Sequence, residues 1–237
     1  MLNILVTGAT AGIGRASAIL LASKGHRVFA AGRNEDALAE LDQGHGNITP
    51  VPLDVIDDDS VAAAVDRVTQ ALDGQTLDVL VHNAGMAIVG PIESVSMEDW
   101  ERQYQTNVLG MLRVTKAVLP AMRERRKGRI VNVSSVAGRV TLAFFGPYHS
   151  SKHALECISD ALRMEMRPHG VEVVLIEPGA VKTRFGSLEQ EQFAHHAETA
   201  PGYSAQQNTL RAFHKELHHG GADPVSVAGA GVAACEA

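Results

Sequence analysis

The sequence is poor in cysteine and in aromatic residues, and it has no long hydrophobic run. Its two cysteines, Cys157 and Cys235, give neither a disulfide framework nor the spacing of zinc ligands. No apolar run approaches the roughly 20 residues of a membrane span. The N-terminus lacks the basic and apolar regions of a signal peptide. We therefore expect a cytoplasmic protein in a reducing compartment, with no membrane and no metal among its partners.

Basic residues are not in excess either. The formal net charge is -6, whereas proteins dedicated to nucleic acids usually carry a basic surplus. We therefore expect no nucleic-acid partner. The chain of 237 residues is long enough to bury a core, and it has no linker and no repeat. One domain over residues 1–237 is the simplest interpretation.

Short β-rich runs alternate with longer helical patterns along the chain. The expected strands are Asn3–Thr7, Arg27–Ala31, Ile48–Leu53, Leu77–His82, Arg129–Ser134 and Val171–Glu177. The expected helices are Ile13–Ser23, Glu35–Leu41, Ser60–Leu72, Met97–Arg125, Pro147–Arg167 and Pro224–Ala237. This order, with strands that are continuously apolar, predicts an α/β fold with a doubly wound parallel sheet covered on both faces. Residues 184–222 are weakly periodic, and we expect a substrate flap there.

Ligands of such sheets bind beyond the carboxyl ends of the strands, and the first strand ends in a glycine-rich loop. Gly8, Gly12 and Gly14 in the segment TGATAGIG allow a tight turn that faces a helix N-terminus. Backbone N–H groups there suit a dinucleotide pyrophosphate. The alternative is a tight turn with no ligand.

The end of the second strand bears on the choice of cofactor. Gly32 stands where an acid would bind the 2′-hydroxyl of NAD, and Arg33 follows it. A guanidinium without a neighbouring acid suits the 2′-phosphate of NADP, and the Thr10 hydroxyl could add a contact. Arg33 as a solvated loop charge is the alternative. Asp54, after the third strand, could accept from the adenine amino group, cap the next helix, or do both.

Tyr148 and Lys152 lie four residues apart in a predicted helix, directly after Pro147. Positions i and i+4 share one helix face, and proline is tolerated in the first turn. A nearby ammonium lowers the pKa of a phenol, which suits proton transfer to a carbonyl oxygen. An ordinary helical turn and a phosphate-binding surface patch are the alternatives from the pair alone.

Together these motifs resemble the short-chain dehydrogenase/reductase family. TGATAGIG is similar to its TGxxxGxG motif, HNAG (82–85) to its NNAG, and PGAVKT (178–183) to its nicotinamide-binding turn. Ser135 lies thirteen residues before Tyr148, which matches the family's Ser…Tyr-x-x-x-Lys set. That spacing selects Ser135 over Ser134, which we expect to form a local hydrogen bond.

The resemblance implies roles for these residues. Tyr148 would be the general acid and base, and Lys152 would lower its pKa and bind the ribose. Ser135 would hold the substrate oxygen, and Asn107 would hold a water leading from Lys152 to solvent. The implied cofactor-binding set is Gly8, Thr10, Gly12, Ile13, Gly14, Arg33, Asp54, Val55, Asn83, Ala84, Gly85, Tyr148, Lys152, Pro178, Gly179, Val181 and Thr183. His82 replaces the family's first asparagine, and we expect a structural role for it.

The resemblance implies an NADP(H)-dependent carbonyl reductase or alcohol dehydrogenase, with NAD possible as cofactor. Apolar residues in the segment 137–145 favour a hydrophobic substrate, and the branch with steroid- and retinol-type enzymes is the most similar. The helices that carry Asn107 and Cys157 would pair in a homodimer or homotetramer. The family's seventh, edge strand is expected to be missing. The alternative function is a non-catalytic NADP-binding redox sensor, which would predict a damaged Ser/Tyr/Lys set; the set here is intact.

Overall fold

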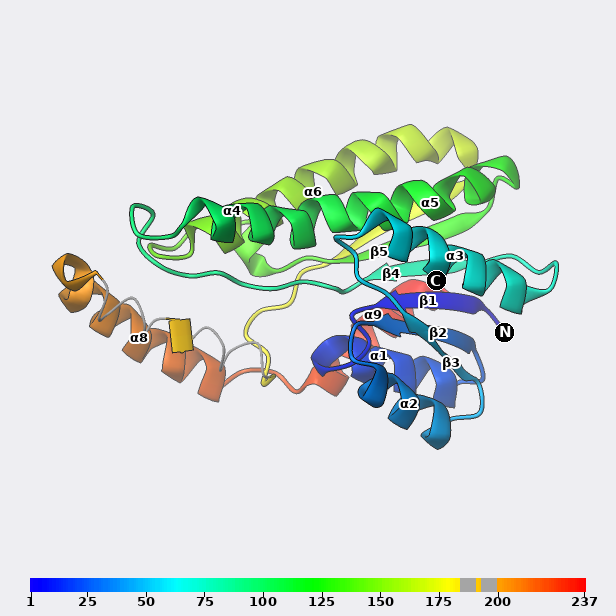
Figure 1. The fold of residues 1–237 in the computed structure, drawn as a ribbon, viewed down its shortest axis with the longest axis horizontal. Coiled ribbons are helices and arrows are strands. Elements are labelled where there is room, and N and C mark those ends of the chain that lie inside the picture. Colours follow the sequence, from blue (N-terminus) through cyan, green and yellow to red (C-terminus); the bar gives the residue numbers. More distant parts are fainter. Residues whose placement is uncertain (184–190, 193–199) are drawn as a thin grey trace.

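The computed structural model describes residues 1–183, 191–192 and 200–237. Its described strands form one six-stranded parallel sheet in the order β3-β2-β1-β4-β5-β6 (Figure 1). All residues of β1 are buried, because helices cover both faces of the sheet and leave no solvent side. The strands are β1 (Asn3–Thr7), β2 (Arg27–Gly32), β3 (Ile48–Pro52), β4 (Val79–His82), β5 (Gly128–Val133) and β6 (Val171–Ile176).

Among the described residues, three helices pack against each face of the sheet (Figure 1). One layer holds α1 (Gly12–Ser23), α2 (Glu35–Gly44) and α9 (Pro224–Glu236). The other holds α3 (Asp58–Leu72), α5 (Gly110–Glu124) and α6 (Gly146–Met166). Successive strand residues point to opposite faces, so Leu5 packs in the α3 layer while Ile4 and Val6 pack in the α1 layer.

The strand order reverses between β1 and β4, which places the loops after these two strands side by side. Open α/β sheets bind their ligands at this reversal point, beyond the carboxyl ends of the strands. Here the glycine-rich loop follows β1 and residues 83–85 follow β4. The fold thus sets two of the sequence motifs against each other.

The fold class predicted from the sequence is confirmed, and one helix is divided differently. The expected helix Met97–Arg125 consists of α4 (Met97–Tyr104), a π-helical turn over Gln105–Leu109, and α5. Strand β6 is an edge of the sheet, and the described residues add no seventh strand beside it. Residues 184–190 and 193–199 of the expected flap lie outside the described residues, and its later part forms α8 (Ser204–His219), a helix that the weak periodicity did not predict.

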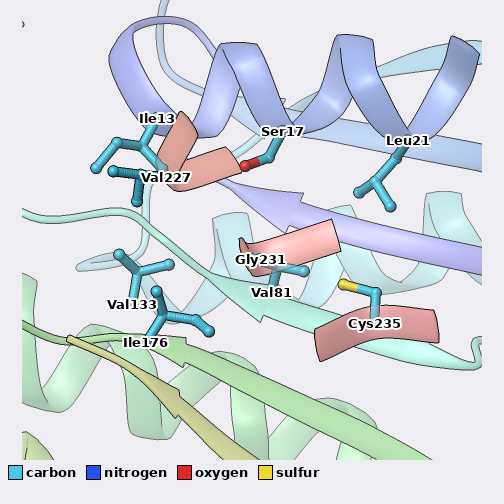
Figure 2. Close-up of a pocket in the computed structure, with 9 residues that line it drawn as sticks. All are labelled: Ile13, Ser17, Leu21, Val81, Val133, Ile176, Val227, Gly231 and Cys235. Atoms are coloured by element: carbon cyan, nitrogen blue, oxygen red, sulfur yellow. The ribbon is translucent and has the colours of Figure 1, made fainter. Parts of the chain in front are cut away.

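A small cavity lies between α1, α9 and the sheet (Figure 2). It measures about 10 Å³, and its polar atoms are few. Ile13, expected at the cofactor, is one of the residues that line this cavity. Burial raises the pKa of the Cys235 thiol to about 12, so the thiol stays protonated here. Gly231 of α9 also lines the cavity.

We expect Gly231→Ala to stabilise the protein. A Cβ at Gly231 would meet its nearest neighbour, Ser17 Oγ, at 3.9 Å, so the methyl group fits without strain. Alanine is better than glycine in a helix by about 1 kcal/mol, and burying the methyl adds up to about 0.8 kcal/mol. The melting temperature should rise by about 4–7 °C when both gains are realised, since each kcal/mol is about 2–4 °C for a chain of this size.

Gly229→Ala is the matched control on the same helix. Nothing lies within 4 Å of a Cβ at Gly229, so this change gains helix propensity without filling the cavity. Gly231→Ala should therefore raise the melting temperature more than Gly229→Ala. An equal or smaller rise would mean that the cavity does not accept the methyl group.

Candidate active site

The glycine-rich loop has a conformation that side chains would oppose. Gly8 has φ +65° and Gly12 has φ +55°, both in the left-handed region. A Cβ at Gly8 would lie 2.7 Å from Ala84 Cα, and one at Gly14 would lie 2.4 Å from the Gly8 carbonyl oxygen. The loop therefore packs directly on the segment after β4, and backbone amides at the start of α1 face the reversal point.

Asn83 and Thr7 join the two strand ends by hydrogen bonds. Asn83 Nδ2 donates to the carbonyl oxygens of Gly8, at 3.0 Å, and of Thr7, at 3.2 Å. Thr7 Oγ1 accepts from the backbone N–H groups of Asn83 and Ala84, both at 3.1 Å. These bonds use the Asn83 side chain inside the protein, so the residue fixes the shape of the loop.

The end of β2 has no room for an acidic side chain beside the glycine-rich loop. A Cβ at Gly32 would lie 2.7 Å from Thr10 Cγ2. The guanidinium of Arg33 is 76% exposed, and its Nη1 lies 4.0 Å from Asp54 Oδ2. The cation at the end of β2 is therefore exposed and is separated from its nearest carboxylate by 4.0 Å.

Asp54 does not cap the next helix, contrary to one of the two roles expected for it. The cap of α3 is Asp57, whose carboxylate accepts from the Ser60 backbone N–H at 2.8 Å. Asp54 Oδ1 instead accepts from Ile56 N at 3.2 Å, which closes the turn ahead of the helix. The neighbouring Val55 is buried against Gly110, where a Cβ would come within 2.7 Å of Val55 Cγ2.

Tyr148 and Lys152 lie on one face of α6, as their spacing predicted. Lys152 Nζ is 6.0 Å from the centroid of the Tyr148 ring and donates to the Val133 carbonyl oxygen at 2.9 Å. Burial lowers the pKa of Lys152 to about 8, against an opposing effect of Glu156. A buried ammonium with a pKa near neutrality can help a phenol to exchange its proton.

Ser135 begins the short 3-10 turn Val136–Gly138, opposite the segment that follows β6. Its Oγ accepts from Ala137 N at 3.1 Å and donates to the Pro178 carbonyl oxygen at 3.3 Å. Ser134 differs from expectation: its hydroxyl is buried and has no hydrogen-bond partner among the described residues. Only its backbone N–H forms a hydrogen bond, to Ile176 O at 2.8 Å.

Asn107 lies in the π-helical turn, and its amide is fully used. Asn107 Oδ1 accepts from Met86 N, and Nδ2 donates to Met86 O, both at 2.9 Å. Nδ2 also donates to Ser151 Oγ on α6 at 3.0 Å. The wider π turn sets the amide against these partners, a distortion that often marks functional sites. Asn107 thus connects the segment after β4 to the helix that carries Lys152.

The segment after β6 lies over the glycine-rich loop. A Cβ at Gly12 would be 3.3 Å from Thr183 Cγ2. Val181 forms a parallel bridge with Ala222, and Lys182 N donates to Ala222 O at 2.9 Å. Pro178 and Gly179 form the bend between β6 and this bridge. Thr183 is therefore held beside the loop after β1.

Comparison with known proteins decides the family. The family model described as short chain dehydrogenase matches residues 2–193. A solved short-chain dehydrogenase from Streptomyces avermitilis has a TM-score of 0.83 and 31% identity, over 97% of this chain and 83% of that one.

The chain belongs to the short-chain dehydrogenase/reductase family.

Among curated proteins, this short-chain dehydrogenase/reductase is 39% identical to the NADPH-dependent 3-dehydrocapnine reductase of Ornithobacterium rhinotracheale, over 76% of this chain and 65% of that protein. It is 35% identical to retinol dehydrogenase 8 of Bos taurus, over 84% of this chain and 66% of that protein. The chain thus spans slightly under two thirds of the length of these two relatives. Its family membership gives it NAD(P)-dependent dehydrogenase or reductase activity on small molecules.

The residues present fit an NAD(P) cofactor. The loop that Gly8, Gly12 and Gly14 shape is closed to larger side chains and begins a helix, as a pyrophosphate site requires. Thr183 lies against this loop, and Lys152 of the Tyr148–Lys152 pair donates to Val133 O at the end of β5. Of the sequence-predicted residues, the structure brings together the three loop glycines, Asn83, Ala84 and Thr183.

Two polar residues of this short-chain dehydrogenase/reductase were missed from the sequence. Gln103 of α4 is fully buried and accepts from Ile88 N at 2.7 Å, while its Nε2 donates to Met86 O at 2.8 Å. Gln192 accepts from Val89 N and donates to Ala87 O, both at 2.8 Å. Both side chains bind backbone N–H and C=O groups of the segment 86–89, as a neighbouring strand would. A glutamine on the buried side of an amphipathic helix is the one signal that could have revealed Gln103.

His82 has the structural role expected of it. It is buried, and burial lowers its pKa to about 3, so the ring is neutral at any ordinary pH. Its Nε2 lies 2.8 Å from Thr115 Oγ1 on α5, a hydrogen bond that joins strand β4 to helix α5.

Among the described residues, no helix is long and apolar enough to cross a membrane.

Proposed function

We propose that this chain is an NADP(H)-dependent oxidoreductase that interconverts apolar carbonyl compounds and their alcohols, with Tyr148 as the general acid and base. The observation that carries the proposal is the Tyr148–Lys152 pair on α6, whose lysine donates to the Val133 carbonyl oxygen at the end of β5, two residues before Ser135. When bound, the nicotinamide supplies or accepts the hydride. The residues of the chain then bind the oxygen and move its proton.

Each residue of the set has a physical task in this proposal. In reduction, Tyr148 gives its phenol proton to the oxygen that gains negative charge, and the hydroxyl of Ser135 stabilises that charge. The ammonium of Lys152 favours tyrosinate, so that the phenol is a stronger acid than a free one. Asn107 keeps α6 in place through Ser151 and leaves its backbone for a water, which would carry the proton onward.

NADP is the proposed cofactor because no acid follows β2 and a cation does. Arg33 can pair with a 2′-phosphate, and the place of an acid at Gly32 is closed by the Thr10 methyl group. The curated relative named for NADPH is consistent with this choice. The expected contacts of Asp54 and Val55 with adenine, and of Val181 and Thr183 with the carboxamide, belong to the same proposal.

An apolar substrate is proposed because apolar side chains surround Tyr148. A buried cluster of Val89 and Phe145 is extended by half-buried residues from three segments of the chain. They are Leu142, Phe144, Tyr148 and, from α8, Leu210. Phe144 and Tyr203 also meet edge to face, with ring centroids 5.9 Å apart. Apolar walls near the reacting tyrosine favour substrates with an apolar group beside the carbonyl.

We also propose that residues 1–237 form one cofactor-binding domain with residues 184–222 as its substrate flap. Copies of the chain would pair as a homodimer or homotetramer through the helices that carry Asn107 and Cys157. Exposed apolar side chains on these elements support this: Leu109 is 39% exposed and Met164 is 72% exposed.

A substrate panel tests the proposed function. We expect NADPH consumption with benzil and acetophenone, and kcat/KM about 100-fold lower with dihydroxyacetone, because the latter buries no apolar group. The measurement is the loss of nicotinamide absorbance at saturating NADPH. A preference for dihydroxyacetone would refute the apolar site, and turnover of none of the carbonyl compounds would refute the proposed reaction.

A further inference from the structure

Glu156 is a buried carboxylate that the proposed reaction does not use. It lies on α6 one helical turn after Lys152, and it is 4% exposed. Neither Oε1 nor Oε2 has a hydrogen-bond partner among the described residues. A buried carboxylate without hydrogen bonds is costly, so nearby positive charge has to stabilise it.

The turn that carries Ser135 leaves room for Glu156. A Cβ at Gly138 would lie 2.7 Å from Glu156 Cγ and 3.1 Å from Ser134 Oγ. The absence of a side chain at Gly138 thus lets the carboxylate lie between this turn and α6. Glu156 therefore contacts the serine-bearing turn while it shares a helix face with Tyr148 and Lys152.

Charged groups from three elements face this carboxylate. Arg139, which follows the turn, lies with Nη2 3.1 Å from Glu156 Oε2 in an ion pair, and 2.9 Å from Glu177 Oε1 at the end of β6. Lys152 and Asp160 lie one turn before and one turn after Glu156 on α6. Arg139 is half exposed, so its attraction is screened by water, whereas Lys152 is buried with the carboxylate.

We propose that Glu156 is a positioning residue for the reaction proposed above, whose carboxylate keeps the Lys152 side chain in its ammonium form beside Tyr148. The inference rests on that proposed function. Glu156 touches neither substrate nor cofactor in this role; it acts through Lys152. Gly138 is its structural counterpart, because it opens the space that the carboxylate fills.

The direction in which Glu156 and Arg139 change the pKa of Lys152 follows from their charges. Burial lowers the pKa of Lys152 to about 8, and the negative charge of Glu156 opposes this fall. Neutralising Glu156 lowers the pKa of Lys152 further, so that the lysine loses its charge near neutral pH. Removing Arg139 takes away a positive charge and leaves Glu156 unshielded, which raises the pKa of Lys152.

The first test reads the titration of Lys152 directly and needs no substrate. Lysine side chains are labelled at the ε-methylene carbon and followed by NMR against pH in the cofactor-free protein, with Lys152 assigned by its loss in Lys152→Arg. We expect Glu156→Gln to lower the titration midpoint of Lys152 by about one pH unit. In Glu156→Asp the midpoint should return most of the way to its wild-type value. An unchanged midpoint in Glu156→Gln would overturn the proposal.

The second test reads the reaction. In reduction of benzil at saturating NADPH, kcat/KM falls at high pH as the Tyr148–Lys152 pair loses its first proton. We expect this limb to move about one pH unit lower in Glu156→Gln and, with the opposite sign, about half a unit higher in Arg139→Ala. A purely structural role would lower the melting temperature of Glu156→Gln and leave the limb in place, which would also overturn the proposal.

Failure of this inference can be told from failure of the proposed function. If Tyr148→Phe is inactive while the high-pH limb stays unmoved in both Glu156→Gln and Arg139→Ala, the proposed function stands and the role of Glu156 is refuted. If Tyr148→Phe is fully active, the function falls and takes the role of Glu156 in the reaction with it. Should Glu156→Gln not fold, Arg139→Ala decides, because its side chain is half exposed and an unmoved limb there refutes the coupling.

Discussion

Tyr148→Phe is expected to lower kcat for carbonyl reduction by about 1000-fold, the middle of the range that one general acid contributes. The change removes one oxygen atom and keeps the ring, which lies edge to face with His149 at a centroid distance of 5.9 Å. NADPH should still bind, with at most the loss of one hydrogen bond from the Tyr148 hydroxyl, because the glycine-rich loop and Arg33 are untouched. The measurement is single-turnover reduction of benzil together with an NADPH dissociation constant.

Tyr104→Phe is the matched control, since it makes the same chemical deletion on α4. It should leave kcat within about twofold of wild type, which is the effect of a surface change of under 0.5 kcal/mol. The melting temperatures of both variants should agree with wild type, so that a loss of activity is not a loss of folding. Comparable activity of Tyr148→Phe and Tyr104→Phe would remove Tyr148 from the reaction.

The strand ends account for most of what could be predicted from the sequence. Continuous apolar runs mark strands that are buried on both faces, and they located all six strands to within two residues at each end. Gly8 and Gly12 could be singled out because their left-handed backbone suits glycine, and Tyr148 and Lys152 because a helix repeats every 3.6 residues. These signals are local, so sequence alone carries them.

The errors come from contacts between segments that are distant in the chain. The π-helical turn depends on hydrogen bonds from Asn107 to Met86 and Ser151, which no local pattern encodes. Asp54 and Asp57 are equally good N-cap residues by type. Asp57 is the cap because helix α3 begins at Asp58. Glu156 has the residue type of an ordinary helix glutamate, and its close contact with Gly138 comes from a distant segment of the chain. Residue roles at the site therefore remain predictions that the proposed variants test.

Gly32→Asp is expected to reverse the cofactor preference. A carboxylate at the end of β2 would repel a 2′-phosphate and accept from the free ribose hydroxyls of NAD. Because a Cβ at Gly32 comes within 2.7 Å of Thr10 Cγ2, the variant is best made together with Thr10→Gly, which opens the space. Adding Arg33→Ala removes the proposed phosphate partner. The ratio of NADPH to NADH affinity should then change by about 1000-fold, from about 4 kcal/mol of lost pairing and added repulsion.

Two simpler variants separate the causes of this change. Arg33→Ala alone should weaken NADPH binding by about 2 kcal/mol and leave NADH binding unaltered, because only the phosphate loses a charged partner. Thr10→Gly with Gly32→Asn has the shape of the acidic variant without its charge, so it should bind NADH no better than wild type. Titration of both cofactors by fluorescence supplies the dissociation constants. If the asparagine variant reversed the preference as fully as the aspartate, crowding at Thr10 would govern cofactor choice, and the electrostatic argument for NADP would fail.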